Sequence, residues 1–504
     1  MDLPMNEKDL SPRSVISALI AAFGLAAIHQ YLFYGNGFGV SVPIFVCLFY
    51  LYIGLFATER MRKPFPRFGW FSFGVVLLLS LTFALFANPL FSVLNVLALL
   101  CLVFAHTTYI LSPKKRSWSD IRLIWDTLDH MIPQNLRHLA TVFRLARSVS
   151  ARKVADHRKQ AIGKVLLGLL IALPLLIIVV GLLTSADSSF DRLLSAIPDW
   201  INESLSFGEG TFRTVYIAVL GLLLFGYLWG FVSPRPEPAL PVPAPAHDEP
   251  LEIRIDPIVA ATVLIAINIV YILFVSLQFS YLFGAWRGVL PAGSSYAEYA
   301  RSGFFELIAV TVINFAILAG TLTFGGQAGK LLRKLNPALL YILVGCSGVM
   351  LVSAFTRLLL YEEAYGYTYI RFLSHAFMIY LAVLLACAGL RIRLARLPLA
   401  KCFIVVSLAA YVIVNYANMD QVIARKNLER YLENGNIDAQ YLTQLSPDTV
   451  PRLLRYSREA DPELNRQLHE RWDYLTREDR KWPAFNLAES RAIHALKEDR
   501  LRRP

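Results

Sequence analysis

The sequence predicts an all-α, polytopic transmembrane helical bundle of about eleven spans, with a small C-terminal helical module outside the membrane. Hydrophobic residues make up 56% of the 504 residues and charged residues only 17%, and the mean hydropathy is +0.49. The apolar residues are gathered in runs of about 20, the length that a helix needs to cross the hydrocarbon core. Helices are expected there because each backbone group is then bonded within its own segment.

The predicted spans fall into two halves. They lie at residues 15–34, 40–56, 70–87, 90–111, 161–183, 214–232, 258–283, 304–322, 338–360, 372–390 and 399–416. The Pro-rich stretch SPRPEPALPVPAPAHDEP is typical of an extended linker. We therefore expect a six-span membrane half (1–232), a cytoplasmic linker (233–256), a five-span half (257–416) and a helical tail (417–504). The first apolar run is interpreted as a retained span, since no small-residue cleavage site follows it.

Basic residues in the links predict the orientation. The links after the second, fourth, eighth and tenth spans are rich in Lys and Arg, whereas the link after the fifth is acidic. Cytoplasmic links carry an excess of Lys and Arg in membrane proteins. We therefore expect a bacterial cytoplasmic (inner) membrane protein with a cytoplasmic N-terminus and an extracytoplasmic C-terminus. The net charge of +12 is attributed to these links, and no nucleic-acid partner is expected.

A cytoplasmic insert at 113–160 has an amphipathic pattern. Its apolar positions are Ile121, Ile124, Trp125, Leu128 and Ile132, and basic residues occupy the other face. Helices of this kind lie in the membrane interface. We expect residues 117–159 to contact the lipid bilayer through anionic headgroups. His130 and His138 are interpreted as surface histidines.

The tail is polar and contains helix caps. Asn418 or Asp420 can begin a helix that stops at Gly435, and Asp438 can begin a second. Ser446 or Asp448 can begin a third, with Pro447 in its first turn. Four aromatic residues are expected to form a small core, with an exposed docking patch as the alternative: Trp472, Tyr474, Trp482 and Phe485.

Soluble-enzyme motifs are missing from the sequence. The stretch GGQAGKLLRK lacks the first glycine of a phosphate loop, and Leu331 stands where a Ser or Thr would hold magnesium. The five cysteines lie in or beside apolar runs without zinc-type spacing. His29 is expected to bond a neighbouring helix rather than a metal. The sequence therefore predicts no catalytic residue, no metal site and no cofactor.

Polar residues gather at the extracytoplasmic ends of the seventh, eighth and ninth spans. Ionisable groups at a hydrocarbon boundary are costly unless they are paired or hydrated. Ion pairs between helices with an interfacial tyrosine belt are one interpretation, and a binding site is the other. The candidate cluster comprises Gln278, Glu298, Tyr299, Arg301, Glu306, Arg357, Glu362, Glu363, Tyr365, Gly366 and Arg371.

Several stretches resemble a known family. They are YILFVSLQFSYLFG (271–284), YAEYARSGFFEL (296–307), YEEAYGYTYIR (361–371) and the segment 417–453. The stretch LLTSADSSFDRLL (from residue 182) adds to them. Together they resemble bacterial integral membrane proteins catalogued as a domain of unknown function, numbered four-one-seven-three and akin to four-one-five-three. The resemblance implies a multi-span protein with a short helical tail and brings no activity. The pair Glu362–Glu363 departs from the family pattern, where one acidic residue or none is expected.

Three classes of function remain from the sequence. The favoured one is an envelope-associated scaffold or signalling partner, with a protein partner bound through the tail. A transporter or lipid-handling protein would use the polar cluster. A membrane enzyme is the weakest of the three, since only Glu306, Glu362 and Glu363 offer acid or base groups.

Overall fold

The secondary structure is helical throughout the described residues. A computed structural model of the chain describes residues 12–56, 65–112, 116–139, 209–233, 255–286, 304–324, 326, 329–435, 438–477 and 480–502. In these ranges helices are joined by turns, and no strand is present. The predicted all-α class is confirmed.

Nine helices in the described part of the chain are long and apolar enough to cross a membrane. They are α1 (Pro12–Phe33), α3 (Arg67–Leu85), α4 (Pro89–Leu111), α10 (Glu209–Val232), α11 (Pro257–Trp286), α13 (Phe304–Phe324), α14 (Leu332–Tyr365), α15 (Tyr369–Arg393) and α16 (Leu399–Tyr416). A shorter apolar helix is α2 (Ser41–Phe56). These helices coincide with ten of the predicted spans, and the predicted span 161–183 lies outside the described residues. The chain is a multi-pass membrane protein.

The chain forms two compact units. The first comprises Met1–Ala84, Asn95–Leu240 and Arg480–Phe485, and the second comprises Leu85–Leu94, Pro241–Asp479 and Asn486–Pro504. Each unit thus includes a short segment from the other end of the sequence. The boundaries at residues 232, 256 and 416 stay predictions.

In the first unit, α1 packs along α10 and α2. Phe225, Leu228 and Ala26 are fully buried in this core. A Cβ atom on Gly221 would lie 2.8 Å from the Phe23 ring, so glycine permits the close approach of α10 to α1. The Tyr216 hydroxyl lies 2.7 Å from Nδ1 of His29. His29 therefore bonds a neighbouring helix, as predicted.

A short helix of the insert packs tightly on α10. The helix α5 (Arg122–Asp129) continues into a π-helical turn, η2 (His130–Gln134). A Cβ atom on Gly226 would lie 2.7 Å from the Asn135 carbonyl oxygen, and one on Gly230 would lie 3.2 Å from Cβ of Gln134. Two glycines of α10 therefore make room for the turn.

His130 and His138 face α10 rather than solvent. Their exposed fractions are 6% and 1%. The His130 ring stacks on Phe231 with centroids 4.2 Å apart, and Nε2 of His138 lies 3.0 Å from the Ser233 carbonyl oxygen. The prediction of surface histidines is wrong, because the polar face of this helix packs inward.

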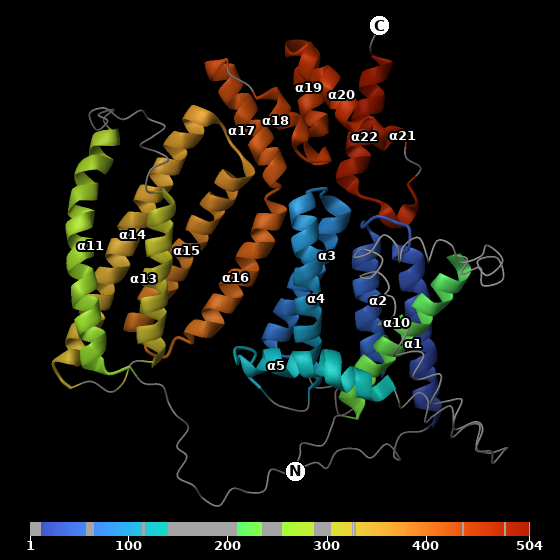
Figure 1. Ribbon diagram of the computed structural model, residues 1–504, viewed down its shortest axis with the longest axis horizontal. Coiled ribbons are helices and arrows are strands. Elements are labelled where there is room, and N and C mark those ends of the chain that lie inside the picture. The colour runs from blue at the N-terminus through green and yellow to red at the C-terminus, as the bar shows by residue number, and fades with distance from the viewer. Residues whose placement is uncertain are drawn as a thin grey trace, which may run out of the picture. The chain divides into compact units, whose positions relative to one another are not determined.

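The opposite face of the insert is apolar and exposed. The exposed fractions are 74% for Ile121, 59% for Ile124 and 69% for Trp125. Leu128 and Ile132 are exposed by 41% and 50%. Within the first unit, α5 runs across its neighbouring helices rather than along them (Figure 1). The predicted amphipathic pattern is therefore present as a helix with an uncovered apolar face.

The membrane part of the second unit is built around α14. This helix contacts α11, α13 and α15 (Figure 1). Leu264, Leu318 and Leu343 form one buried cluster with almost no exposed surface. The side-chain amide of Asn314 donates to the Ser347 hydroxyl at 3.0 Å, and this hydrogen bond joins α13 to α14.

The tail begins with the predicted caps. Its helices are α17 (Met419–Asn434), α18 (Ala439–Gln444), η3 (Pro447–Thr449), α19 (Val450–Ala460), α20 (Pro462–Trp472), α21 (Tyr474–Arg477), η4 (Trp482–Ala484) and α22 (Leu487–Leu501). The Asn418 side chain accepts from the Gln421 N–H, and Gly435 ends α17 with φ of 70°. Asp438 caps α18 in the same way. These local predictions are confirmed.

Leucines form the core of the tail. Leu453, Leu464, Leu468 and Leu496 have no exposed surface and belong to one cluster. The predicted aromatic core is wrong except for Trp472, which is 7% exposed. The other three aromatic residues are about half exposed: Tyr474 by 51%, Trp482 by 52% and Phe485 by 48%. Trp482 instead donates to the Tyr31 hydroxyl at 3.0 Å in the first unit.

Candidate functional site

The candidate site lies in the second unit, where α14 ends and α15 begins. Gly366 ends α14 with φ of 81°, and its N–H donates to the Glu362 carbonyl oxygen at 2.8 Å. A Cβ atom here would lie 2.6 Å from Oδ1 of Asn427 and 2.8 Å from Nη1 of Arg430. Only glycine suits both this conformation and this contact. The residue therefore allows α17 of the tail to approach the turn closely.

A buried acid and a histidine face each other beside this turn. Glu362 is 1% exposed, and its Oε2 lies 2.9 Å from Nε2 of His375 on α15. The Phe355 ring packs edge-on against the imidazole with centroids 4.5 Å apart. Among the described residues, Oε1 of Glu362 and Nδ1 of His375 have no hydrogen-bond partner. The pair is thus held together but keeps one open polar atom on each member.

Arg371 closes the turn from the other side. Its guanidinium donates to the Gly366 carbonyl oxygen and lies over the Tyr361 ring, 4.3 Å from the centroid. A cation over an aromatic face is attracted by the ring quadrupole. The first turn of α15 and the last turn of α14 are therefore bonded through this arginine.

The tail clamps the backbone of the turn. Oδ1 of Asn427 accepts from the Tyr367 N–H, and its amide donates to the Tyr367 carbonyl oxygen, both at 2.8 Å. Nε of Arg430 donates to the Glu363 carbonyl oxygen at 3.1 Å. The Tyr441 hydroxyl accepts from the Tyr369 N–H at 3.0 Å. Side chains of α17 and α18 thus satisfy backbone groups that the helix ends leave open.

A buried carboxylate fastens a second turn, Leu85–Leu94, to the tail. Asp420 is 1% exposed. Its Oδ2 accepts from the Asn88 side-chain amide at 2.5 Å. Its Oδ1 accepts from the Ser446 N–H at 3.0 Å and from the Tyr369 hydroxyl. One acid therefore joins two turns of the membrane part to the tail.

A second acid, Asp448, binds Ala87, the residue before Asn88 in the same turn. Its Oδ2 accepts from the Ala87 N–H at 2.8 Å, and its Oδ1 accepts from the Asn418 amide at 3.0 Å. Burial raises the pKa of Asp448 above its ordinary value, and the Ala87 N–H partly offsets that effect. The Asn486 amide donates to the Phe86 carbonyl oxygen at 2.7 Å. Three successive residues, 86 to 88, are thus each bonded by a different segment of the tail.

The structure describes only part of the predicted polar cluster. Glu362, Glu363, Tyr365, Gly366 and Arg371 gather at the α14–α15 turn. Glu363 and Tyr365 are exposed there. Glu306 is exposed in the first turn of α13, and Arg357 is half-buried on α14. The Gln278 side chain, Glu298, Tyr299 and Arg301 lie outside the described residues. Pairing of Arg357 with Glu306 or Glu363 stays a prediction.

Sequence reasoning missed several members of this site. His375 gave no signal beyond being a lone histidine in an apolar span. Asn88 lies in an apolar turn between two spans, and nothing in the sequence pattern links it to the tail. Asp420 and Asp448 were expected as helix caps, whereas the structure buries both as acceptors for distant donors.

The chemistry available at this site is hydrogen bonding and proton exchange. In the part of the chain that the structure describes, no three His, Cys, Asp or Glu side chains are grouped to hold a metal ion. Glu362 and His375 can share or pass a proton, because each is a titratable group within hydrogen-bond reach of the other.

Comparison with known proteins identifies one family. The family model described as "Domain of unknown function (DUF4153)" matches residues 73–456. The match begins within α3 and ends within α19, so it includes both turns that the tail fastens. No curated protein and no solved structure matches the chain.

Proposed function

This chain belongs to the DUF4153 family, and we propose that it is an envelope scaffold or signalling partner that presents its C-terminal module to another protein. In this proposal the protein lies in a bacterial inner membrane, with its N-terminus in the cytoplasm and its tail outside. The observation that carries the proposal is the fastening of residues 86, 87 and 88 by three segments of the tail.

A fastened module suits a scaffold. Ordering a flexible segment at the moment of binding costs free energy, and a segment that is already ordered avoids that cost. Buried hydrogen bonds to charged groups contribute about 1.5–3 kcal/mol each. The bonds to Asp420 and Asp448, together with the Asn427 clamp on Tyr367, keep the module in one position on the membrane part of its own unit.

The orientation rests on the Lys and Arg pattern of the links and has a direct test. In a variant whose five native cysteines are replaced, we expect Ser490→Cys on α22 to react with a membrane-impermeant thiol reagent in intact cells. Ser117→Cys, in the part of the insert that precedes α5, should react only after the cells are opened. Both positions are exposed. Labelling of Ser117→Cys alone in intact cells would reverse the orientation.

The insert is proposed to rest on the cytoplasmic membrane surface. The apolar face of Ile121, Ile124 and Trp125 is exposed, and such faces are buried in the headgroup region by interfacial helices. A spin label at Ile124→Cys in liposomes with anionic lipid should be more accessible to oxygen than to a water-soluble nickel complex. A label at Ser117→Cys should show the opposite preference. Equal accessibility to the water-soluble nickel complex at both positions would contradict the proposed lipid contact.

The scaffold role is tested by purification from membranes. We expect the wild-type protein to retain one envelope protein at constant stoichiometry. The double variant Asp420→Ala/Asn427→Ala, which loosens the module, should be inserted at similar levels and lose that protein. The exposed substitution Glu433→Ala is the matched control on α17. Absence of any stoichiometric protein from the wild type, or its retention by the loosened variant, would contradict the proposal.

A transporter or lipid-handling function is the second candidate, and it is favoured by one observation. Glu362 is almost fully buried and has an open oxygen beside His375. Buried acid and histidine groups in membrane proteins often carry protons along a pathway. If this candidate is right, proteoliposomes should conduct protons in response to a pH gradient, and Glu362→Gln should abolish the flux. A proton leak equal to that of empty liposomes excludes the candidate.

A further inference from the structure

The tail carries a groove that its fastening does not use. The groove lies between α19 and α22 and has a volume of about 490 Å³. Its lining is dominated by basic side chains from both helices, with one acid among them: Arg455, Arg458, Arg491, His494, Glu498 and Arg502. None of these residues takes part in the bonds to the two turns. The surface is therefore free of the anchoring role described above.

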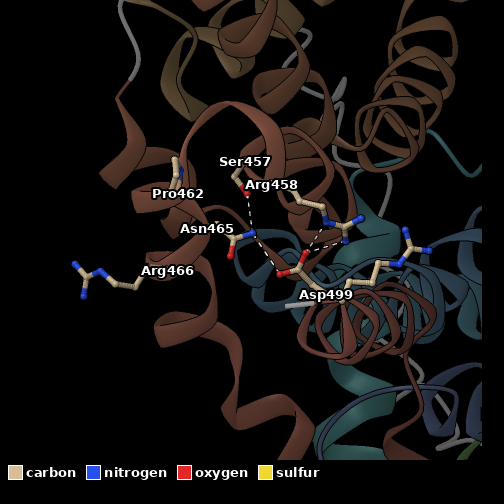
Figure 2. Close-up of a pocket in the computed structure, with 7 residues that line it drawn as sticks. Ser457, Arg458, Pro462, Asn465, Arg466 and Asp499 are labelled. Atoms are coloured by element: carbon tan, nitrogen blue, oxygen red, sulfur yellow. Dashed lines mark hydrogen bonds and ion pairs between the residues drawn. The ribbon is translucent and has the colours of Figure 1, made fainter. Parts of the chain in front are cut away.

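The arginines of this groove already bind carboxylates of the same chain. Arg458 donates through Nε and Nη2 to Oδ1 of Asp499, each at 2.8 Å. Figure 2 draws a second pocket, which shares Arg458 with the groove. It shows Arg458 and Asn465 directed at the Asp499 carboxylate. Arg502 pairs with Glu498. The geometry of the groove thus suits carboxylate groups, which guanidinium forks bind well.

Two further arginines are available for an external acid. Arg455 and Arg491 are exposed, and neither has an ion pair with any residue that the structure describes. They come from the two helices that form the sides of the groove. A ligand between them would meet positive charge from both sides, which favours an anionic ligand.

The distribution of charge favours an extended ligand. Arg491 lies in α22 and Arg502 directly follows its last residue. At a rise of about 1.5 Å per residue, the two positions are about 16 Å apart along the helix axis. An extended peptide covers that distance with about five residues, at about 3.3 Å each. A single phosphate needs donors that converge on one point, whereas these are spread along the groove.

We infer that this groove binds an extended, carboxylate-rich segment of a partner protein. The inference rests on the proposed scaffold function, for which it supplies the chemistry of the partner. Arg455 and Arg491 make the new ion pairs, and Arg458 and Arg502 exchange part of their internal pairing for the ligand.

The test uses the full-length protein in nanodiscs and a fluorescent peptide of ten glutamates. We expect binding that weakens as salt rises, because exposed ion pairs are screened. The variant Arg455→Glu/Arg491→Glu should bind at least tenfold more weakly. The control Arg425→Glu/Arg477→Glu changes the net charge equally at exposed arginines outside the groove and should bind as the wild type does. An equal loss in both variants means nonspecific attraction and overturns the inference.

Two further outcomes decide between ligands and between proposals. Displacement of the peptide by pyrophosphate at a lower concentration than by free decaglutamate would assign the groove to phosphate and overturn the carboxylate inference. If the groove variant still purifies with the envelope partner, the inference fails while the scaffold stands. If the wild type binds decaglutamate but purifies with no partner, the scaffold fails while the groove's preference for carboxylates stands.

Discussion

Asp420 accepts a hydrogen bond of 2.5 Å from the side-chain amide of Asn88, a residue 332 positions earlier in the chain. Asp420 begins the tail, and Asn88 lies in the turn between two membrane helices. The acid is buried, so its oxygens depend on donors within the protein for their hydrogen bonds. This contact makes the tail part of the folded membrane unit to which the turn belongs.

The first prediction concerns that contact. Asp420→Ala removes the acceptor for Asn88, Tyr369 and the Ser446 N–H. Leaving buried donors unsatisfied costs about 1–3 kcal/mol, so the detergent-solubilised protein should unfold at a lower temperature. Glu433→Ala, on the exposed end of the same helix, should change stability by less than about 0.5 kcal/mol. Equal effects of the two substitutions would mean that the hydrogen bonds to Asp420 contribute nothing to the stability of the protein.

The second prediction concerns the pair Glu362–His375. Removing one member leaves a buried polar atom of the other without its hydrogen-bond partner, which costs about 1–3 kcal/mol. We therefore expect Glu362→Gln and His375→Gln each to destabilise the protein, and the double variant to lose less than the sum. A double-mutant cycle on thermal unfolding measures the difference. Additive losses would show that the two side chains, 2.9 Å apart, do not depend on each other.

The third prediction concerns Gly366. Gly366→Ala forces a side chain into a left-handed conformation, which costs about 1–3 kcal/mol. It also displaces Asn427 from its bonds with Tyr367. Protease cleavage within the tail should become faster. Gly345→Ala in α14 is the matched control, since a Cβ there meets no atom within 4 Å; its cleavage rate should equal that of the wild type.

The fourth prediction concerns pH. Burial acts to raise the pKa of Asp499, but hydrogen bonds from His469, Arg458 and Asn465 outweigh it and hold that pKa below its ordinary value. The ionised group therefore stabilises the fold above the unfolded pKa, about 3.9, and this stabilisation is lost as pH falls through the folded pKa. In a scan from about pH 6 to about pH 3, the unfolding temperature of Asp499→Asn should fall less steeply than that of the wild type.

Asp448→Asn is the counterpart with the opposite sign. Burial raises the pKa of Asp448, so the folded protein binds more protons there than the unfolded chain between the unfolded pKa and the folded one. Acidification through that window favours the fold. Removing this group should make the loss of stability on acidification steeper. If the unfolding temperature of both variants and of the wild type changed with pH at the same rate, both predicted effects would be contradicted.

Local features of the fold could be predicted from the sequence. The apolar runs indicated the spans, and the caps at Asn418, Gly435 and Asp438 are present as expected. Each of these signals depends on residues within a few positions of one another. The apolar pattern of the insert was equally local, although its polar face proved to be buried.

Contacts between distant residues could not be predicted in the same way. The tail core is built from leucines of several helices, and the sequence did not indicate that these would exclude Trp482 and Phe485. His375 and Asn88 acquire their roles only when the chain brings Glu362 and Asp420 beside them. Of the candidate site, the α14–α15 turn was therefore predicted, but its partners were not.

The most direct test of the fastened tail is a distance measurement between spin labels in nanodiscs. Labels at Tyr365→Cys, beside the α14–α15 turn, and Ser490→Cys, on α22, are both at exposed positions of the second unit. With the native cysteines replaced, we expect one narrow distance distribution. Adding Asp420→Ala and Asn427→Ala should broaden it. A distribution in the otherwise unaltered protein as broad as that of the loosened variant would contradict the account, because the tail would then move freely.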